Sequence, residues 1–395
     1  MYKIPLSVPS LNGKELQYVK ECIDTEWVSS AGKYVDLFEQ KIAKYTGSKY
    51  AVACVNGTAA LQVSLRLAGV EPDDEVIVST LTFIASVNAI TYNNAKPIFM
   101  DADKYYNIDI EKTIEFINNQ TVYKNGFTYN KKTNNKITAI IPVHIWGNAC
   151  WLDPLIELCN ERNISIVEDA AESMGTFYIN GEHSSKHTGT IGLLGCLSFN
   201  GNKIITTGGG GIILTDDEAL AEKAKYLTNQ AKDDSIRYVH DEIGYNFRLT
   251  NIQAALGVAQ LEQLPEILKR KKQIYHFYQS ELEGVDGLSI SKTPDYANNN
   301  HWMNLLQIDK KVYNEDREEL MKRLERNGIQ TRPVWRLNHE QKPYKDCQYY
   351  KIERAFSLVE KSLCLPSSMN LNFSSIKIII KNLLSTVKLE GKESN

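Results

Sequence analysis

One lysine stands out in a glycine-rich stretch of the sequence. Residues 198–211 read Ser-Phe-Asn-Gly-Asn-Lys-Ile-Ile-Thr-Thr-Gly-Gly-Gly-Gly, which places Lys203 between two apolar runs of strand length. Two strands joined in this way would hold the amine at the end of a sheet, with bare backbone beside it. An amine in that position can form a Schiff base with an aldehyde if it can lose its proton. A plain hairpin turn that carries a surface lysine fits the same residues.

Two further features fall at the ends of predicted strands. Gly57 and Thr58 open a helix directly after strand 50–55, and a helix N-terminus offers free N–H groups and a partial positive charge to a phosphate. Asp169 follows strand 164–168, where a carboxylate faces the ligand crevice and can keep a ring nitrogen protonated. The plain alternatives are an ordinary helix cap and an aspartate that caps a turn.

The order of these features is more specific than any one of them. Ser198 lies five residues before Lys203, on the preceding strand, where its hydroxyl can contact a phosphate. A phosphate-type helix start, then Asp169, then Ser198 with Lys203, supplies contacts for the phosphate, the ring nitrogen and the aldehyde of pyridoxal phosphate. The residues therefore predict a site for that cofactor.

Other candidate motifs are weaker. His183 and His187 have i, i+4 spacing, but they lie in a Gly/Ser-rich segment where no helix is expected, so we expect no metal site. The four glycines at 208–211 precede a strand and do not fit the dinucleotide-binding GxGxxG pattern. The basic run 269–272 lies on a predicted helix, and we expect it to form a solvated face.

Apolar segments of strand length alternate with helical ones from residue 50 onward. Strands are expected at 50–55, 75–79, 96–102, 137–143 and 164–168, and helices at 56–68, 82–92, 110–118 and 154–162. This alternation indicates a mainly parallel α/β sheet covered on both faces, with ligands at the carboxyl ends of its strands. The polar segment 121–135 is expected to be an exposed excursion.

The pattern changes in the last third of the chain. A long helical region is expected at 251–282, with a break at Pro265, followed by a strand at 305–308 and helices at 314–327, 354–362 and 375–387. Earlier in the chain, further helices are expected at 14–24, 35–45 and 217–230. We therefore expect a large α/β domain over residues 1–255 and a smaller α+β domain over residues 256–395, with a frayed tail from residue 389.

Composition excludes several classes of function. The 395 residues are 43% hydrophobic and 24% charged, and their net charge of −3 argues against a nucleic-acid partner. No apolar stretch is long enough for a signal peptide or a membrane span. The seven cysteines include no CxxC pair and read as reduced, mostly buried thiols. We expect a soluble cytoplasmic enzyme with no membrane partner.

The chain also resembles a known family over nearly its whole length. The matching stretches are Trp27-Val-Ser, Gly32, Phe38-Glu39, Asn56-Gly-Thr-Ala-Ala-Leu61, Thr82-Phe83, Asp101, Val143-His-Ile-Trp-Gly147, Glu168-Asp-Ala-Ala-Glu-Ser173, Gly189-Thr-Ile-Gly192, Ser198-Phe-Asn-Gly-Asn-Lys203, Thr207-Gly208, Gly244-Tyr-Asn-Phe-Arg248 and Gly328-Ile-Gln-Thr-Arg332. In these it is similar to the DegT/DnrJ/StrS family of pyridoxal-phosphate-dependent sugar aminotransferases.

The resemblance implies a fold and a set of roles. The fold would be that of fold type I, aspartate-aminotransferase-like, with a large, mainly parallel seven-stranded sheet domain and a smaller α+β domain, in a homodimer with shared active sites. Lys203 would bind the cofactor covalently, Asp169 would contact its pyridine nitrogen, and Gly57, Thr58 and Ser198 would hold its phosphate.

Three roles come from the resemblance alone. Phe83 would stack on the cofactor ring, and Glu172 would lie beside the ring, where relatives carry Gln, His or Glu. Asn246 would reach the phosphate of the cofactor in the neighbouring subunit. Without the resemblance, these residues would read as a core Phe, a surface Glu and a loop Asn.

A narrower likeness concerns the substrate. The stretch Thr331-Arg-Pro-Val-Trp-Arg-Leu-Asn-His339, followed by Pro343-Tyr344, resembles the branch that acts on 4-keto-6-deoxy-N-acetylhexosamine nucleotides in legionaminic-acid-type pathways. Arg332, Trp335 and His339 would then shape the sugar or nucleotide pocket, and Arg248 would serve an anionic group. The alternatives are a core tryptophan and ion-paired arginines.

The sequence thus predicts a transaminase that works through the pyridoxal and pyridoxamine forms of the cofactor. L-glutamate would be the amino donor, and C4 of a keto-sugar linked to UDP or GDP would be the acceptor. The alternatives are transamination at C3, a pyridoxal-phosphate sugar dehydratase and a non-catalytic regulator. Dehydratases of this type carry His in place of Lys203, and retention of Lys203, Asp169 and Ser198 argues against a regulator.

Overall fold

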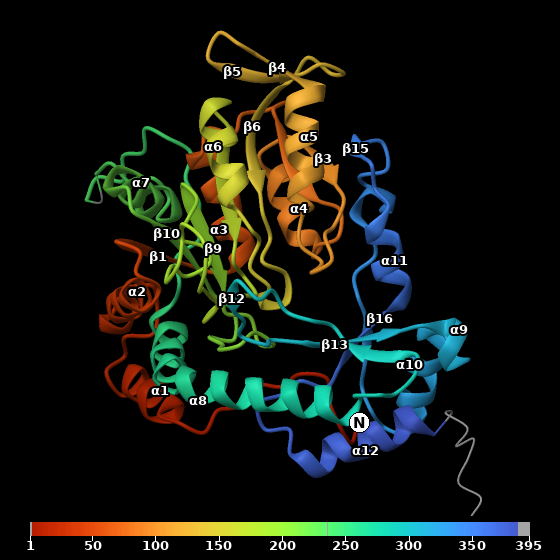
Figure 1. Cartoon of the computed structure of the whole chain (residues 1–395). Coiled ribbons are helices and arrows are strands. Elements are labelled where there is room, and N and C mark those ends of the chain that lie inside the picture. Colours follow the sequence, from red (N-terminus) through yellow and green to blue (C-terminus); the bar gives the residue numbers. More distant parts are fainter. Residues whose placement is uncertain (1, 235, 386–395) are drawn as a thin grey trace, which may run out of the picture.

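A ten-stranded sheet forms the centre of the larger part of the molecule (Figure 1). The computed structural model describes residues 2–234 and 236–385. The main path of the sheet runs through β1 (Tyr50–Cys54), β10 (Gly211–Thr215), β9 (Leu194–Ser198), β7 (Ser165–Asp169), β6 (Lys136–Ile141), β2 (Glu75–Ser79), β3 (Lys96–Met100) and β15 (Tyr349–Tyr350). On this path only β10 runs antiparallel to its neighbours. The carboxyl ends of β1, β9, β7, β6 and β2 therefore lie on one edge of the sheet.

Alternate residues of the strands pack on opposite faces of the sheet. On β2, Val76 and Val78 belong to one hydrophobic cluster, and Ile77 between them belongs to another. The first cluster includes α3 (Gly57–Leu67), α4 (Ile84–Tyr92) and α7 (Glu218–Thr228), and the second includes α5 (Ile110–Gln120) and α6 (Asp153–Glu161). Burial on both faces explains why these strands read as continuous apolar runs.

Most of the segment 121–135 is exposed, as predicted, but it also contains two strands that the sequence did not predict. It forms a hairpin of β4 (Thr121–Lys124) and β5 (Phe127–Asn130), and β5 pairs with β6. The buried side chains of β5 are the polar Thr128 and Asn130, whose partners are the carbonyl oxygen of Arg162 and the carboxylate of Glu75. Polar residues on the buried face hide the strand from a reading based on hydrophobicity.

The C-terminal part is a smaller α+β unit. Its four-stranded antiparallel sheet has the order β11 (Leu288–Ile290), β13 (Asn304–Ile308), β16 (Ser362–Leu365) and β14 (Arg332–Pro333). Its helices are α9 (Lys310–Tyr313), α10 (Arg317–Arg326), α11 (Arg354–Lys361) and α12 (Phe373–Leu384). Smaller elements are β8 (Phe177–Tyr178), which pairs with β12 (Ala297–Asn298), and the short 3-10 helices η1 (Ile145–Gly147) and η2 (Asn338–Glu340).

One long helix, α8 (Asn251–Glu281), runs beneath both parts (Figure 1). The predicted break at Pro265 is wrong, because the helix continues through the proline. Pro265 is exposed, while Leu264 and Ile267 beside it are buried in the core, so packing holds the helix together at the lost backbone hydrogen bond. Near its start, α8 packs against α1 (Glu15–Asp24) and α2 (Lys33–Thr46).

The division between the two domains remains a proposal. The expected boundary at 255/256 falls within the first turns of α8. From Ala254 to Ile267 the buried residues of the helix belong to the core of the large sheet, and from Ile274 onward they belong to the C-terminal core. This packing supports a division between Ile267 and Ile274.

The basic run 269–272 does not form a uniformly solvated face, so that prediction is wrong for one of its residues. Lys271 is buried, and its Nζ donates hydrogen bonds to the carbonyl oxygens of Trp302, at 2.9 Å, and Ser367. Burial lowers the pKa of Lys271 to about 7. Charge alone indicated the surface, whereas the position on α8 points this side chain into the protein.

Two observations concern the chain as a whole. All seven cysteines are free thiols, and only Cys347 is not buried. Within residues 2–234 and 236–385, no helix combines the length and the apolar character that crossing a bilayer requires.

Candidate active site

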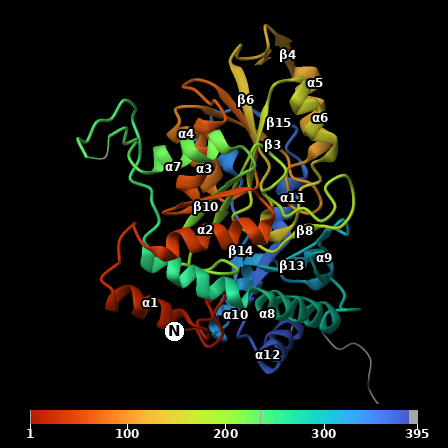
Figure 2. The ribbon, with the colours of Figure 1, turned by 90° about the vertical axis from the view of Figure 1, so that its left-hand side faces the viewer.

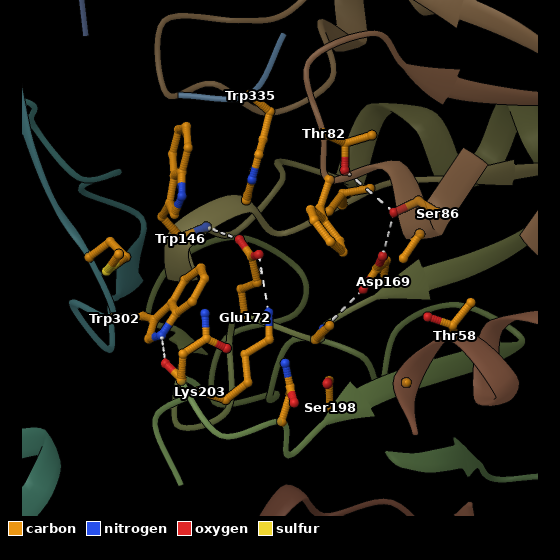
Figure 3. Close-up of a pocket in the computed structure, with 18 of the residues that line it drawn as sticks. Thr58, Thr82, Ser86, Trp146, Asp169, Glu172, Ser198, Lys203, Trp302 and Trp335 are labelled. Carbon is orange, nitrogen blue, oxygen red and sulfur yellow. Dashed lines mark hydrogen bonds and ion pairs between the residues drawn. The ribbon is translucent and has the colours of Figure 1, made fainter. Parts of the chain in front are cut away.

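The residues predicted at the strand ends meet in one cavity of about 430 Å³ (Figure 3). The cavity is lined by Gly57, Thr58, Phe83, Asp169, Glu172, Ser198, Lys203, Arg332 and Trp335, among others. Most come from the loops and helix starts that follow β1, β2, β7 and β9, and the last two come from the C-terminal part. Nine of the twelve predicted site residues are thus brought together.

The N-terminus of α3 forms one end of the cavity. Asn56 caps the helix by accepting from the N–H of Ala59 at 2.8 Å, and no hydrogen bond in the described part of the chain uses the N–H of Gly57 or Thr58. A Cβ at Gly57 would lie 2.8 Å from the Cβ of Ser198, so only glycine leaves the space between helix and strand open. Free N–H groups, two hydroxyls and the helix dipole suit a phosphate.

Asp169 is buried at the end of β7. Its Oδ2 accepts from the hydroxyl of Ser86 at 2.6 Å, and its Oδ1 accepts from the N–H of Ala171 at 3.0 Å. Ser86 lies on α4, 3.4 Å from the hydroxyl of Thr82. A carboxylate has about four acceptor positions, so Asp169 can accept from one more donor in the cavity, such as a protonated ring nitrogen.

The neighbouring Glu168 points to the other side of β7 and fixes the strand end. Its carboxylate accepts from His144 Nε2 at 2.8 Å and from the N–H groups of Gly189, Ile191 and Gly192. Burial alone would raise the pKa of Glu168, but these hydrogen bonds, with that from His144 first, hold it below its ordinary value. The strand therefore presents Asp169 from a rigid support.

The amine of Lys203 lies at the centre of the cavity, on the loop that joins β9 to β10 (Figure 3). Its Nζ donates to Glu172 Oε1 at 3.2 Å, and the other carboxylate oxygen of Glu172 accepts from the N–H of Trp146 at 2.9 Å. Burial raises the pKa of Glu172, and the nearby Lys203 opposes that rise. Glu172 thus places a carboxylate oxygen within hydrogen-bond distance of the amine.

Aromatic rings form the outer half of the cavity. Trp335 stacks on Trp146 with 4.9 Å between ring centroids, and it lies 5.9 Å from the ring of Phe83. Arg332 is exposed at the rim, and its guanidinium donates to the carbonyl oxygen of Thr331. Flat apolar faces beside a cation suit a sugar ring joined to an anionic group.

Three predicted site residues do not line this cavity. Asn246 is exposed on the segment between α7 and α8, and Arg248 lines a separate pocket beside α2. His339 Nδ1 lies 2.6 Å from the hydroxyl of Thr80, and burial lowers its pKa. In this chain His339 anchors the segment that carries Trp335, and its role in shaping the substrate pocket stays a prediction.

The two histidines with i, i+4 spacing have separate protein partners. His187 is buried, accepts from the N–H of Gly175 and contacts the carbonyl oxygen of Thr188, and burial lowers its pKa to about 4. His183 lies 3.7 Å from Asp153. No group of three His, Cys, Asp or Glu side chains suited to a metal ion occurs among the described residues.

The sequence reasoning missed four residues that line or support the site. Trp146 contributes a ring and a backbone N–H, and the motif Val143-His-Ile-Trp-Gly147 is the sequence signal for it. Ser86 lies one helical turn after Thr82, which a helical wheel would have placed on the same face. Trp302 and Asn300 come from the segment before β13, for which strand-end reasoning gave no signal.

Comparisons with known proteins place the chain in a family. Residues 9–384 match the DegT/DnrJ/EryC1/StrS aminotransferase family. The chain belongs to this family. A GDP-perosamine synthase from Caulobacter vibrioides is 36% identical over 384 residues, which cover 96% of this chain and 97% of that protein. A GDP-perosamine synthase from Escherichia coli O157:H7 is 37% identical over 383 residues, covering 97% and 98%.

Solved structures agree with this assignment. The aminotransferase TlmJ from Streptoalloteichus hindustanus superimposes with a TM-score of 0.86 at 26% identity, covering 97% of this chain and 98% of that one. As a member of the DegT family, the chain that contains Lys203 and Asp169 is itself a pyridoxal-phosphate-dependent nucleotide-sugar aminotransferase of fold type I. The open space at the α3 N-terminus and the remaining acceptor capacity of Asp169 fit that cofactor. The seven strands expected for the fold are present, and β4, β5 and β15 extend them to ten.

Proposed function

We propose that this aminotransferase transfers an amino group from L-glutamate to C4 of a 4-keto-6-deoxy-N-acetylhexosamine linked to UDP or GDP. The observation that carries the proposal is a single cavity that joins Lys203, Asp169 and the α3 N-terminus to an aromatic outer half. The inner half suits the cofactor, and the outer half suits a sugar nucleotide.

The inner residues have distinct roles in the proposal. Bound pyridoxal phosphate supplies an electron sink for the bonding electrons of the substrate carbon. Asp169 accepts a hydrogen bond from the ring N–H and keeps that proton in place, and the α3 N-terminus with Ser198 holds the phosphate. Lys203 holds the cofactor covalently and, when free, carries a proton to or from the substrate carbon on its Nζ.

The outer residues would bind the sugar nucleotide. The stacked rings of Trp146 and Trp335 offer an apolar face to the deoxygenated side of a 6-deoxy sugar, and Arg332 offers a cation to the diphosphate. The names of the two GDP-perosamine synthases support a nucleotide-linked amino sugar as product. Such a product would serve legionaminic-acid-type or other surface glycans.

One experiment tests the reaction and the substrate together. The visible spectrum of the purified enzyme is recorded, L-glutamate is added, and then each member of a panel of UDP- and GDP-linked keto-sugars is offered. We expect glutamate to bleach the absorbance of the bound cofactor and one keto-sugar to restore it. NMR of the product distinguishes an amine at C4 from one at C3, and an amine at C3 would overturn the regiochemistry.

A variant without the lysine provides the control. Lys203→Ala should lose the absorbance typical of a covalently bound cofactor and should lose turnover, while its circular dichroism spectrum stays that of the native enzyme. Normal turnover in this variant would reject the role of Lys203.

We also propose a homodimer with shared active sites. Asn246 is exposed and lies outside the cavity of its own chain, which supports a contact with the phosphate of the partner's cofactor. The segment between α7 and α8 extends away from the rest of the chain (Figure 2), with Ile236, Tyr238 and Ile243 exposed. The seven free thiols support a cytoplasmic location.

A further inference from the structure

The indole ring of Trp302 lies against the amine of Lys203 (Figure 3). The Nζ atom is 4.4 Å from the centroid of the ring, and Trp302 is only 3% exposed. Its Nε1 donates at 2.6 Å to the carbonyl oxygen of Asn202, the residue before Lys203. The ring is therefore bonded to the backbone that carries the lysine. A cation over an indole face is attracted by the ring quadrupole, and the attraction grows when water is excluded.

Lys203 therefore has two partners of different kinds. The carboxylate of Glu172 accepts one N–H at 3.2 Å, and Trp302 covers the amine with its π face. The side chains are 13% exposed for Lys203 and 5% for Glu172. A shielded ammonium is costly without partners, and a lysine brings three N–H donors, of which a single carboxylate oxygen satisfies one.

One buried amide ties both partners together. Asn300, which is 1% exposed, donates from Nδ2 to the carbonyl oxygens of Glu172 at 2.8 Å and Met174 at 3.0 Å. Its Oδ1 accepts from the N–H of Trp302 at 2.9 Å. The same side chain therefore fixes the backbone of the carboxylate and the backbone of the ring.

A buried lysine binds a third polar group of Trp302, its carbonyl oxygen. Nζ of Lys271 donates to the carbonyl oxygen of Trp302 at 2.9 Å, so the N–H, the carbonyl and the indole N–H of this tryptophan are all bonded within the protein. Buried polar groups are normally paired, so these bonds show that the protein holds the ring in one orientation. In that orientation the face of the ring lies over Nζ of Lys203.

We propose that Trp302 and Glu172 form a holding site for the protonated amine of Lys203 whenever that amine is not joined to the cofactor, and that Asn300 is the positioning residue for both. The proposal rests on the proposed role of Lys203 as the cofactor-bearing amine and not on the identity of the sugar. In each half-reaction the freed amine would rest between carboxylate and ring, close enough to return.

The charge of the amine in this site depends on its surroundings. Besides Glu172, the ionisable groups that line the cavity are Asp169, Arg332 and the thiol of Cys364, whose pKa burial raises to about 12. Lys271 lies behind Trp302 and bonds its backbone. Of all these groups, only Glu172 forms an ion pair with Lys203. Removal of the ring leaves this ion pair in place and isolates the contribution of the π face.

The test measures the reactivity of Lys203 directly. The full-length enzyme is brought to its pyridoxamine form, in which Lys203 is free, and pulses of acetic anhydride across a pH series are read by peptide mass spectrometry. Because a neutral amine reacts and an ammonium does not, the midpoint should move to lower pH by about one unit in Trp302→Leu, and by less in Trp302→Phe. Reactivity at neutral pH should rise about tenfold in Trp302→Leu.

Three further variants complete this test of the pH midpoint. Asn300→Ala should shift the midpoint in the same direction, whereas Trp151→Leu, which changes a tryptophan outside the cavity, should leave it in place. An unchanged midpoint in Trp302→Leu overturns the holding site. An acetylation rate of Lys203 that rises by the same factor at every pH also overturns it, because such a rise reports only greater exposure of the amine. Lys271→Met should give a smaller shift than Trp302→Leu, and a larger one would contradict the central role of the ring.

Borohydride reduction separates failure of this proposal from failure of the proposed function. In the native enzyme it should fix the cofactor on the peptide that contains Lys203. A cofactor fixed on another lysine overturns both proposals. A cofactor fixed on Lys203 together with an unshifted Trp302→Leu profile overturns the holding site alone.

Discussion

Asp169 combines a fixed position with unused acceptor capacity. Ser86 and the N–H of Ala171 hold its two oxygens, and the buried pair of Glu168 with His144 anchors the strand behind it. A carboxylate held in this way can keep a proton on a ring nitrogen throughout the reaction. Its effect then falls on the transition state, where negative charge flows into the ring, more than on binding.

Replacement of this carboxylate should affect rate more than affinity. Asp169→Asn keeps the shape of the residue but removes the charge that holds the ring proton, so we expect kcat to fall by roughly 10²–10⁴-fold with a small change in KM. Ser86→Ala, which removes only one hydrogen bond to the carboxylate, should cost about tenfold. Steady-state kinetics at saturating glutamate measures both effects. A native kcat in Asp169→Asn would reject the ring-nitrogen role.

The sequence located the inner half of the site well because a simple rule governs it. Gly57, Asp169 and Ser198 each follow or end a strand, and the carboxyl ends of parallel strands meet at one edge. That rule does not cover Trp302, because its segment follows α8 in the sequence and reaches the cavity only through tertiary packing. Lys271 was misplaced for a related reason, since no local pattern shows that a charged helix position faces carbonyl groups of two other segments.

At the scale of elements, one aspartate fastens the C-terminal part to the large sheet. Asp101 follows β3, is fully buried, and accepts from the N–H groups of Glu353, Arg354 and Ala355 at the start of α11. Lys112 also donates to it at 2.7 Å. Burial would raise the pKa of Asp101, but the hydrogen bond from Lys112 and those from the backbone lower it below its ordinary value.

This arrangement predicts a pH-dependent contribution to stability. Because the folded-state pKa of Asp101 is lowered, its stabilising effect is complete above the unfolded pKa near 4 and is lost as pH falls through the folded value. Asp101→Asn should therefore destabilise the protein by about 2 kcal/mol at pH 7, with a smaller difference from the native protein below pH 4. Urea unfolding at several pH values measures this. A difference that is the same at every pH would contradict it.

The elements that were predicted well are those with a strong local pattern. β2 was placed to the residue because its five positions are all buried, and Asn56 marked the start of α3 by its capping side chain. β14 and β15 each have two residues, too few for any periodicity, and they exist because β16 and β3 offer partners. The passage of α8 through Pro265 likewise depends on packing along the rest of the helix.

At the scale of the whole molecule, the position of Asn246 is informative. It lies beside Asn229, where the chain returns from an extended loop with exposed apolar side chains, of which Ile236 is 82% and Ile243 81% exposed. Exposed apolar groups on one extended segment favour a contact with another subunit. The proposed homodimer would cover them and bring Asn246 to the partner's cofactor.

Mixing of two inactive variants tests the shared site. In a hybrid of Lys203→Ala and Asn246→Ala subunits, one of the two sites has an intact Lys203 and receives an intact Asn246. Random pairing of co-expressed subunits makes about half of the dimers hybrids, so we expect about a quarter of native activity. The unseparated mixture is assayed for this value, and hybrids purified with orthogonal tags should show about half of native activity. Activity equal to the average of the two separate variants would argue against the cross-subunit contact.

The outer sides of β1 and β3 in the large sheet are covered. On the outer side of β1, the N–H of Ala53 donates to the carboxylate of Glu39, and the N–H of Val55 donates to the carbonyl oxygen of Phe247. At the other end, the two-residue β15 covers β3, which also contains Pro97 and so lacks one donor. Strand addition between copies is thereby hindered at β1 and β3, which lowers the risk of edge-to-edge aggregation at these two strands.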